Sequence, residues 1–488
     1  MRRTAALSLV LMASVLGGCA VGPDYKRPEE LALPQNHRGL EGPAAEASFA
    51  DVPWWEAVTG DDVLRGLIAE AIAKNQDLRV ATARVEEYRA LSGIAKADAY
   101  PWVGYGASAS RQKEPIPGTG QIPTYNSFGA SAFASWEIDL WGRIRRSNES
   151  ALDQLLATTE ARRGVYLSLV SGVAQAYLEL RELDLELEIA RRTLASRKDS
   201  LDLVTKRLLG GISNKLESSQ AESAYAQTEA IIPQLQQAIF AKENQLALLL
   251  GRLPGSIPRG QSLADAKAPA VPAGLPSALL ERRPDVKQAE YLLASANAQV
   301  GVATALLFPQ LSLTGTAGYG SAELSDLLKA DSFLWNLAAG LTGPIFQGGR
   351  LKRNLEAAKA RWEQAKAQYE KAALAAFGDV ANSLEAYRRT QESRAAQERN
   401  VAALRQAERT AIARYDGGVS AYLEVLDAQR ELFVGENALA QVMRDEHLSI
   451  VSLYKALGGG WNQPEMPPGA AAEPAAPAQP TPPPPSVP

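Results

Sequence analysis

The sequence predicts a chain built from two copies of one unit, which reads helix, strand, strand, long helix and return helix. The strands are expected to belong to a membrane β-barrel and the helices to a long α-helical barrel. A unit of about 190 residues occurs twice almost without insertion. Each copy has two uncharged segments in which apolar residues alternate with small or polar ones, and a proline-free stretch of more than 60 residues with helical periodicity.

The first eighteen residues are predicted to be a secretory signal peptide. Arg2 and Arg3 precede the run AALSLVLMASVL, whose twelve residues are fewer than the roughly 20 that cross a bilayer as a helix. Cys19, the only cysteine, follows Leu-Gly-Gly, so the sequence resembles a bacterial lipobox. That resemblance implies cleavage before Cys19 and a covalent lipid on it. Because Ala20 rather than Asp follows, it also implies sorting to the outer membrane, with residues 19–61 as a lipidated amino-terminal segment.

Composition excludes several classes of protein. Charged residues are 22% of the 488 and hydrophobic ones 46%, which is not the composition of a helical membrane protein. The formal net charge of −4 becomes −6 when the two arginines of the signal peptide are removed, and there is no basic patch of the kind that nucleic acid requires. A single cysteine allows no intrachain disulfide, so stability is expected to come from packing.

The duplication is clearest where RLLGGISNKLE, Arg207 to Glu217, recurs as RYDGGVSAYLE, Arg414 to Glu424. Other pairs keep offsets between 207 and 210 residues: Asp77 with Asp285, Pro101 with Pro309, Gly142-Arg143 with Gly349-Arg350, Ala176-Tyr177 with Ala386-Tyr387, and Leu250-Gly251 with Leu457-Gly458. We therefore assign repeat unit 1 to residues 62–252 and repeat unit 2 to residues 277–460, joined by a proline-containing linker at 253–276.

Each unit is expected to begin with a helix, at roughly 62–99 in unit 1, followed by two strands. The apolar positions of the second strand of unit 1 are Phe128, Ala130, Ala132, Ala134 and Trp136. The corresponding positions of unit 2 are Leu311, Leu313, Ala317 and Tyr319, which alternate with Ser312, Thr314 and Thr316, and the segment SFLWNLAAGLTGPI follows. This period of two predicts strands with one apolar face that can meet lipid.

A long rod follows the strands in each unit. From Gly142 to Leu209 leucines recur every seven residues, at positions 180, 187, 194, 201 and 208. The second seam position holds Leu183, Ala190 and Val204, and Arg197 interrupts it. Some 65 residues make a helix on the order of 100 Å long. The stretch from Arg350 to Tyr415 repeats the rod with a less regular, alanine-rich seam.

Each rod is predicted to reverse at a pair of glycines, because glycine most easily adopts the left-handed geometry that ends a helix. The pairs are Gly210-Gly211 and Gly417-Gly418. They would form two copies of one hairpin tip.

Four strands are too few to close a membrane barrel. The smallest barrels have eight, and an open strand edge in lipid costs several kcal/mol for each unsatisfied backbone group. Either the strands lie outside a membrane or several chains share them. A trimer would supply twelve strands and, with two rods and two return helices per chain, twelve helices in a ring.

The Cys19 lipobox with its VGPDY sequel, the duplicated unit, the FPQLSLTG strand and RYDGGVSAYLEVLDAQ resemble the TolC-like outer-membrane efflux channels, in their lipoprotein branch. The resemblance covers roughly residues 19 to 460. It implies a homotrimer whose twelve-stranded barrel sits in the outer membrane of a Gram-negative bacterium. Its helical barrel would reach across the periplasm to an adaptor protein and an inner-membrane RND-type transporter.

A gate is expected just past the second tip. Leu423, Glu424, Asp427 and Arg430 share one flank of a helix, so in a threefold ring Glu424 and Asp427 would each supply three carboxylates to a narrow passage and attract cations. In the resembled family the matching positions line the constriction, and Tyr415 matches a tyrosine bonded between helices. The first tip has Glu217 but Gln220 at the position equivalent to Asp427. The exposed glycine tips are expected to meet the adaptor.

No catalytic or cofactor motif is present, so an enzyme is not predicted and the covalent lipid is the only expected attached group. His37 and His447 are too few and too far apart in sequence to suggest a metal site. Two alternatives to drug efflux remain open: a channel for type I protein secretion, and a periplasmic coiled-coil lipoprotein that acts as a scaffold. The cargo is not readable from the sequence, because a passive tube takes what its pump delivers.

The carboxyl-terminal residues 461–488 are rich in proline and alanine. They are predicted to form neither helix nor sheet interior and to be a disordered or polyproline tail.

Overall fold

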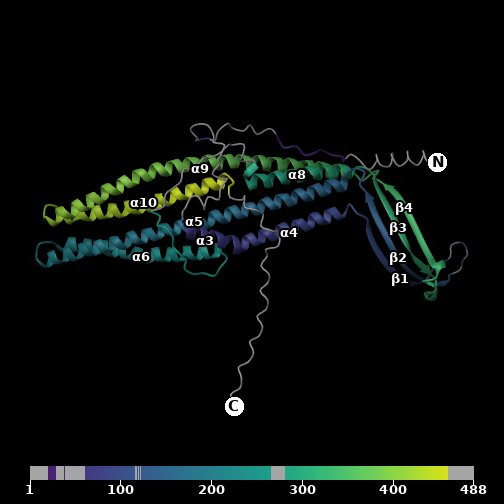
Figure 1. Ribbon diagram of the computed structural model, residues 1–488, viewed down its shortest axis with the longest axis horizontal. Coiled ribbons are helices and arrows are strands. Elements are labelled where there is room, and N and C mark those ends of the chain that lie inside the picture. Colours follow the sequence, from purple (N-terminus) through teal and green to yellow (C-terminus); the bar gives the residue numbers. More distant parts are fainter. Residues whose placement is uncertain are drawn as a thin grey trace, which may run out of the picture.

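The computed structural model is an elongated molecule with four strands at one end and two helical hairpin tips at the other (Figure 1). It describes residues 20–28, 38, 61–115, 118, 120, 122–264 and 281–459. The predicted signal peptide, Cys19, the second part of the linker and the proline-rich tail lie outside the described residues. Within the described ranges no helix has both the length and the hydropathy of a membrane span.

Apart from α3, the described residues of the two halves contain the same order of main elements. The first half contains α3 (Asp62–Lys74), α4 (Gln76–Ala97), β1 (Trp102–Lys113), β2 (Thr124–Ile138), α5 (Arg143–Leu209) and α6 (Lys215–Leu249). The second contains α8 (Pro284–Ala305), β3 (Gln310–Ser321), β4 (Phe333–Thr342), α9 (Arg350–Asp416) and α10 (Tyr422–Ala456), with short 3-10 turns at Leu324–Asp326 and Ala330–Ser332. Both rods have 67 residues, both return helices have 35, and α4 and α8 both have 22. The duplication is therefore preserved residue for residue in the helices.

The prediction of a single helix over 62–99 is wrong, because the chain breaks at Asn75. This residue has an extended ψ of 133°, and its side chain caps α4 by accepting from the backbone N–H of Leu78. Its amide nitrogen also donates to the carbonyl of Leu249 at 2.9 Å. The end of α6 therefore docks against the break, and a Cβ on Gly251 would lie only 2.3 Å from the carbonyl oxygen of Lys74. A tertiary contact has overridden local helix propensity here.

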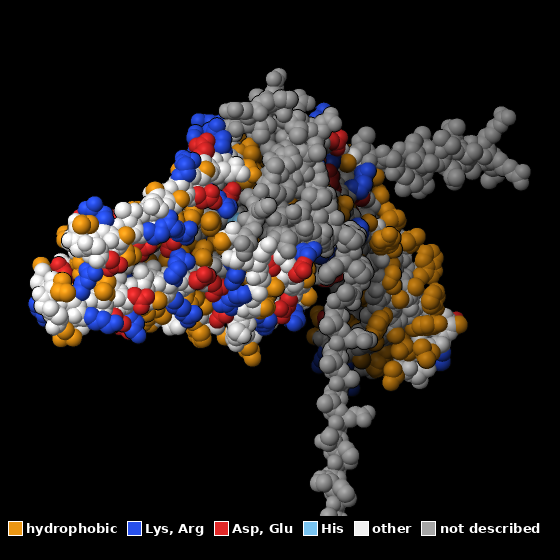
Figure 2. Space-filling view, turned by 60° about the vertical axis from the view of Figure 1, so that its left-hand side comes forward, with side chains coloured by type: hydrophobic (Ala, Val, Ile, Leu, Met, Phe, Trp, Pro, Cys, Tyr) orange, Lys and Arg blue, Asp and Glu red, His pale blue; other side chains and the backbone are white. Residues whose placement is uncertain are grey.

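The four strands form one antiparallel sheet in the order β1-β2-β3-β4. Its register pairs Trp136 with Leu313 and Ala317 with Trp335, so these side chains point to the same face. The apolar face predicted from the sequence is continuous across β2, β3 and β4: Phe128, Ala130, Ala132, Ala134, Trp136, Leu311, Leu313, Ala317, Tyr319, Phe333, Trp335, Leu337 and Leu341. The opposite face carries mostly serine, threonine and glycine. Figure 2 shows hydrophobic side chains gathered over the strands, whereas charged ones cover the helices.

The main hydrophobic core lies midway along the molecule, where α3, α5, the end of α6 and the end of α10 meet. Its fully buried members include Ile68, Val173, Leu180, Leu246 and Ile450. A smaller core near the tips holds Val204 of α5, Ala221 of α6 and Val425 of α10. Both cores join the two halves, so neither hairpin packs alone.

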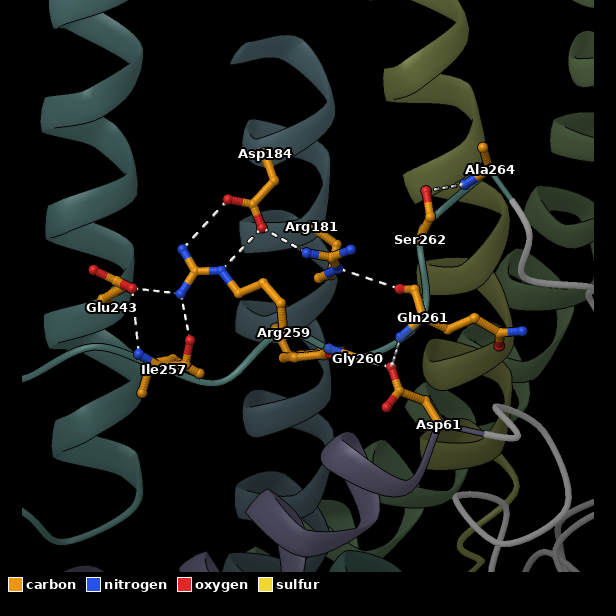
Figure 3. Close-up of polar contacts among 11 residues, drawn as sticks. Asp61, Arg181, Asp184, Glu243, Ile257, Arg259, Gly260, Gln261, Ser262 and Ala264 are labelled. Atoms are coloured by element: carbon orange, nitrogen blue, oxygen red, sulfur yellow. Dashed lines mark hydrogen bonds and ion pairs between the residues drawn. The ribbon is translucent and has the colours of Figure 1, made fainter. Parts of the chain in front are cut away.

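The segment that follows α6 is tied across the middle of the rods by polar contacts (Figure 3). The guanidinium of Arg259 lies between Asp184 of α5, at 3.0 Å, and Glu243 of α6. The backbone N–H of Gln261 donates to the Asp61 carboxylate at 3.2 Å. Tyr177 donates to that same carboxylate at 2.9 Å. This network holds α3, α5 and α6 together as one body.

Residues 20–28 run along both halves near the base of the strands. The backbone N–H of Val21 donates to the carbonyl of Trp141, and the amide of Asn297 in α8 donates to the carbonyl of Pro23. Asp24 pairs with Arg146 at 2.5 Å. The segment therefore straps the start of α5 to α8.

Candidate functional site

The two tips have the same backbone geometry. In the first, the N–H of Gly211 donates to the carbonyl of Leu208, and the N–H of Ile212 donates to that of Arg207. The second tip repeats this pattern residue for residue. Only the second glycine of each pair is left-handed, with φ +71° at Gly211 and +72° at Gly418. This is the hydrogen-bond pattern of a Schellman motif, which ends a helix and satisfies its last carbonyls.

The side chain of Arg207 joins the first tip to the second. One guanidinium nitrogen donates to the carbonyl of Tyr415 at 3.1 Å, and the other lies 3.4 Å from the Asp416 carboxylate. Its Cζ atom is 4.4 Å from the centre of the Tyr415 ring, which is the geometry of a cation–π contact. The Tyr415 hydroxyl donates to Glu217 of α6 at 3.4 Å. Two residues of the first tip, Arg207 and Glu217, thus hold one tyrosine of the second.

Tyr415 and Tyr422 form the buried base of the second tip. Their ring centres are 5.4 Å apart, and both side chains are largely removed from solvent. Burial, with a smaller contribution from Tyr415, raises the pKa of Tyr422 to about 12. Burial also raises the pKa of Tyr415 above its ordinary value. Both phenols therefore stay protonated at neutral pH, and Tyr415 remains a hydrogen-bond donor.

The structure places the four predicted gate residues on the exposed side of α10. Leu423, Glu424, Asp427 and Arg430 are all exposed, whereas the intervening Gln429 is buried. In a single chain the Leu423 side chain is 59% exposed, although it is apolar. This flank is therefore available to another surface or to a passage.

Each carboxylate of this flank has an arginine beside it. Arg430 pairs with Asp427 and also lies 3.1 Å from Glu431. Arg414, at the end of α9, lies 3.4 Å from Glu424. A ring built from this flank would therefore be a mixed ring of carboxylates and guanidinium groups. Its preference for cations is expected to be weaker as a result.

Sequence reasoning missed Arg207 and Arg414 as partners of the gate. Both are the first residue of the repeated eleven-residue motif, so their recurrence was the available signal. The recurrence did not reveal their partners, because Arg207 contacts the other tip, whereas Arg414 contacts Glu424 of its own tip.

Among the residues that the structure describes, no group of three or more His, Cys, Asp or Glu side chains is placed to hold a metal ion.

Comparison with known proteins gives consistent matches over nearly the whole chain. Residues 67–252 and 275–459 match the family described as outer membrane efflux protein. The cation efflux system protein CusC of Escherichia coli O6:H1 is 36% identical over 462 residues, which cover 93% of this chain and 98% of the relative. The solvent efflux pump outer membrane protein SrpC of Pseudomonas putida is 37% identical over 459 residues, covering 92% and 97%.

A solved structure matches with similar coverage. The open state of the Neisseria gonorrhoeae MtrE outer membrane channel aligns with a TM-score of 0.82 and 32% identity, covering 91% of this chain and 98% of that one.

Proposed function

The chain belongs to the outer membrane efflux protein family, and from this membership we propose that three copies form the exit duct of a tripartite efflux pump. It is an outer-membrane component of an efflux system and not an enzyme. Small molecules would pass through it after an inner-membrane transporter and a periplasmic adaptor hand them over. The relatives are named for efflux of cations and solvents, which supports a small-molecule cargo rather than an exported protein.

The observation that carries the proposal is the single four-stranded sheet with one apolar face. Within the described residues, β1 and β4 each have one edge with no strand beside it. In hydrocarbon each unsatisfied backbone group costs several kcal/mol, so the sheet needs neighbours if its apolar face meets lipid. Three copies supply twelve strands, which lies within the range of closed membrane barrels.

The trimer is tested by extracting the full-length lipidated protein in mild detergent and measuring its mass, then recording conductance in planar bilayers. We expect a trimer with discrete conductance steps. A stable monomer, or a trimer without conductance, would contradict the proposal.

The flank of Leu423, Glu424, Asp427 and Arg430 serves as the constriction of this duct, and Tyr415 holds it shut through its bond to Glu217. Asp427→Ala with Glu424→Ala is expected to raise single-channel conductance, because smaller side chains leave a wider passage. The double change should also reduce cation preference, because the passage loses negative charge. Arg430→Ala should raise cation preference instead, since it leaves Asp427 without its partner. Unchanged conductance and selectivity in both variants would show that the constriction lies elsewhere.

The tips serve as the adaptor contact. Exposed apolar side chains cluster there, with Leu209 84%, Ile212 81% and Val419 68% exposed. Such a cluster at the end of a polar rod is typical of a surface that another protein covers. Bulky substitution at Gly211 or Gly418, the left-handed residues of the two turns, should reduce capture of the adaptor in a pull-down while trimers still form. Loss of the trimers themselves would instead favour a purely structural role for Gly210, Gly211, Gly417 and Gly418.

Lipidation of Cys19 completes the proposal. The strap at residues 20–28 begins beside Gly142, where an added Cβ would lie 2.7 Å from Ala20, so Ala20 is held at the base of the strands. Cys19→Ser should remove the acyl chains, which mass spectrometry of the intact protein detects. If the mature protein instead has the mass of the unmodified chain, lipidation of Cys19 is refuted.

A further inference from the structure

Helix α5 of the first half meets α10 of the second along a ladder of polar contacts. The two helices lie side by side between the middle of the molecule and the tips (Figure 1). As residue numbers rise along α5 they fall along α10: Glu182 with Arg444, Glu186 with Gln441, Arg192 with Glu436, and Ser196 and Ser200 with Gln429. This seam is where the two hairpins separate if the tips move apart.

The part of the seam farther from the tips is held by two buried carboxylates that are paired with arginines. Glu182 is 4% exposed and accepts two hydrogen bonds from Arg444, at 2.6 and 2.7 Å. Glu436 is 5% exposed and pairs with Arg192 of α5 and Arg405 of α9. Removing one partner of a buried ion pair is strongly destabilising, so this part of the seam resists separation.

The next contact toward the tips is incompletely satisfied. Arg197 and Gln429 are 7% and 3% exposed and lie at the same level of the seam. The Arg197 guanidinium turns toward α6, where one nitrogen donates to the Ala224 carbonyl at 2.8 Å and to Thr228 Oγ1 at 2.6 Å. Within the described residues, Arg197 Nε and Gln429 Oε1 have no hydrogen-bond partner and no carboxylate pairs with Arg197. Burial lowers the pKa of Arg197, and Tyr422 opposes that shift only in part. On the side of α10 the guanidinium faces the Phe433 ring, whose centre lies 5.9 Å from Cζ, and no carboxylate.

A further protein chain has no access to these atoms. Both side chains are already more than nine-tenths buried in a single copy, between α5, α6 and α10. A buried, unpaired donor or acceptor carries its full desolvation penalty, and a buried charge carries more. Separation of α10 from α5 would let water reach both groups and remove that penalty.

The second half of the chain provides an internal comparison. With the offset of 207 residues, Arg197 and Thr228 correspond to Leu404 and Gly435. There the leucine packs so closely that a Cβ on Gly435 would lie 2.7 Å from Leu404 Cδ1. The fold therefore accepts leucine at this position where the facing residue is glycine, and the leucine side-chain end must shift where it is threonine. The buried charge in the first half is not required to build the hairpin.

We propose that Arg197 and Gln429 form a weak point in the seam. Their buried Nε and Oε1 atoms, which lack hydrogen-bond partners, favour opening of the gate on the tip side of the Glu436 contact. This inference rests on the proposed function as a gated duct. Arg197 and Gln429 act as positioning residues, because they set how readily α10 leaves α5 and touch no cargo.

The first test is Gln429→Glu in the full-length lipidated trimer. The serine hydroxyls, which accept from the Gln429 amide in the present protein, can donate to the new carboxylate. The carboxylate also gives Arg197 a counter-charge, so the closed seam gains stability. We expect the open-time fraction of single channels to fall about tenfold, which corresponds to about 1.4 kcal/mol, and the unfolding temperature to rise.

The second test is Arg197→Leu, which installs the residue of the other half. Thr228 keeps a partner because its hydroxyl also donates to the Ala224 carbonyl at 3.0 Å. We expect a lower open-time fraction and a higher unfolding temperature, as for Gln429→Glu. If Arg197 instead stabilises the contact between the helices, the same variant raises the open-time fraction and lowers the unfolding temperature. That result would overturn the inference.

The double variant separates the two explanations further. With leucine at position 197, Gln429→Glu buries a carboxylate without a counter-charge, so its effect should change sign and the open-time fraction should rise. Equal effects of Gln429→Glu in both backgrounds would overturn the inference.

Gln227→Glu is the matched control, since it makes the same change on the exposed side of α6, one residue from Thr228. It should leave the open-time fraction unchanged. If the unmodified protein forms no conducting pore, the proposed function fails. If it conducts and neither Gln429→Glu nor Arg197→Leu alters the open-time fraction, only the weak point is refuted.

Discussion

The two hairpins of this molecule share one backbone and differ in their chemistry. Rods α5 and α9 have the same length, and the turns that follow them share the two Schellman hydrogen bonds and nearly the same glycine φ angles. The first rod nevertheless buries charged residues such as Glu182 and Arg197, whereas the buried residues of α9 are alanine, valine, leucine and tyrosine. Duplication has preserved geometry, and the polar contacts between the hairpins depend on residues that only one copy has.

The contact between Glu182 and Arg444 should show the largest effect, because it joins the two hairpins through a buried carboxylate. Arg444→Met is expected to lower the free energy of unfolding by about 3 kcal/mol, since Glu182 keeps its burial and loses its partner. Chemical denaturation measures this.

Arg405→Met is the matched comparison, because Glu436 retains Arg192 after that change. It should lower the free energy of unfolding by less than half as much. Equal losses of stability in Arg444→Met and Arg405→Met would show that the second arginine beside Glu436 does not compensate for the loss of the first.

The left-handed glycines test whether the two turns are equivalent. Gly211→Ala and Gly418→Ala should each lower the free energy of unfolding by about 1–2 kcal/mol, because both place a Cβ on a backbone with positive φ. The preceding glycines, Gly210 and Gly417, have φ of −80° and −74° and should accept alanine with little loss. A large difference between the two left-handed positions would break the comparison.

The return helices differ at the N-cap, the residue just before each helix. Asn214 caps α6 by accepting from the Glu217 N–H at 3.0 Å, whereas Ala421 at the start of α10 has no side chain that can cap. Ala421→Asn should therefore raise the free energy of unfolding by about 1 kcal/mol, and Asn214→Ala should lower it by a similar amount. If Ala421→Asn fails to stabilise, the two helix starts differ in more than this side chain.

A half-buried carboxylate in the first rod should give a small effect that depends on pH. Burial, together with Glu149, raises the pKa of Asp153 to about 6, and the corresponding residue of α9 is Ala360. A raised carboxyl pKa stabilises the fold below pH 4 and loses that contribution as pH rises through 6. Asp153→Ala should therefore be more stable than the original protein at pH 8, by about 1 kcal/mol after allowance for solvent screening.

The advantage of Asp153→Ala should shrink as the pH falls toward 4, as denaturation at several pH values would show. An advantage that is independent of pH would assign it to helix propensity instead of titration.

Sequence reasoning located the rods and their turns to within one residue. The expected rod from Gly142 to Leu209 is α5 at Arg143–Leu209, and the expected rod from Arg350 to Tyr415 ends at Asp416. Absence of proline, a heptad pattern and paired glycines are local signals, so they can be read from one chain. The alternation that predicted an apolar strand face is also local, and the sheet register preserves it.

The features that could not be read depend on contacts between distant segments. The break at Asn75 arises because the end of α6 docks there, although an asparagine before an acidic first turn was a usable capping signal. The arginines beside Glu424 and Asp427 were visible as residues. Their pairing depends on rotamers, which periodicity does not give. Arg197 was recognisable in the sequence as an interruption of the heptad pattern. That no carboxylate faces it could be seen only once α6 and α10 were placed beside α5.

The one-sided sheet also has a consequence for how the protein is made. A newly exported copy has a lipid-seeking face and two strand edges before any partner copy reaches it, and such edges promote aggregation. The charged rods keep the remainder of the same polypeptide in water. In the proposed trimer two further copies must join the first, so biogenesis is expected to depend on chaperones that shield the strands during transit and on copy number.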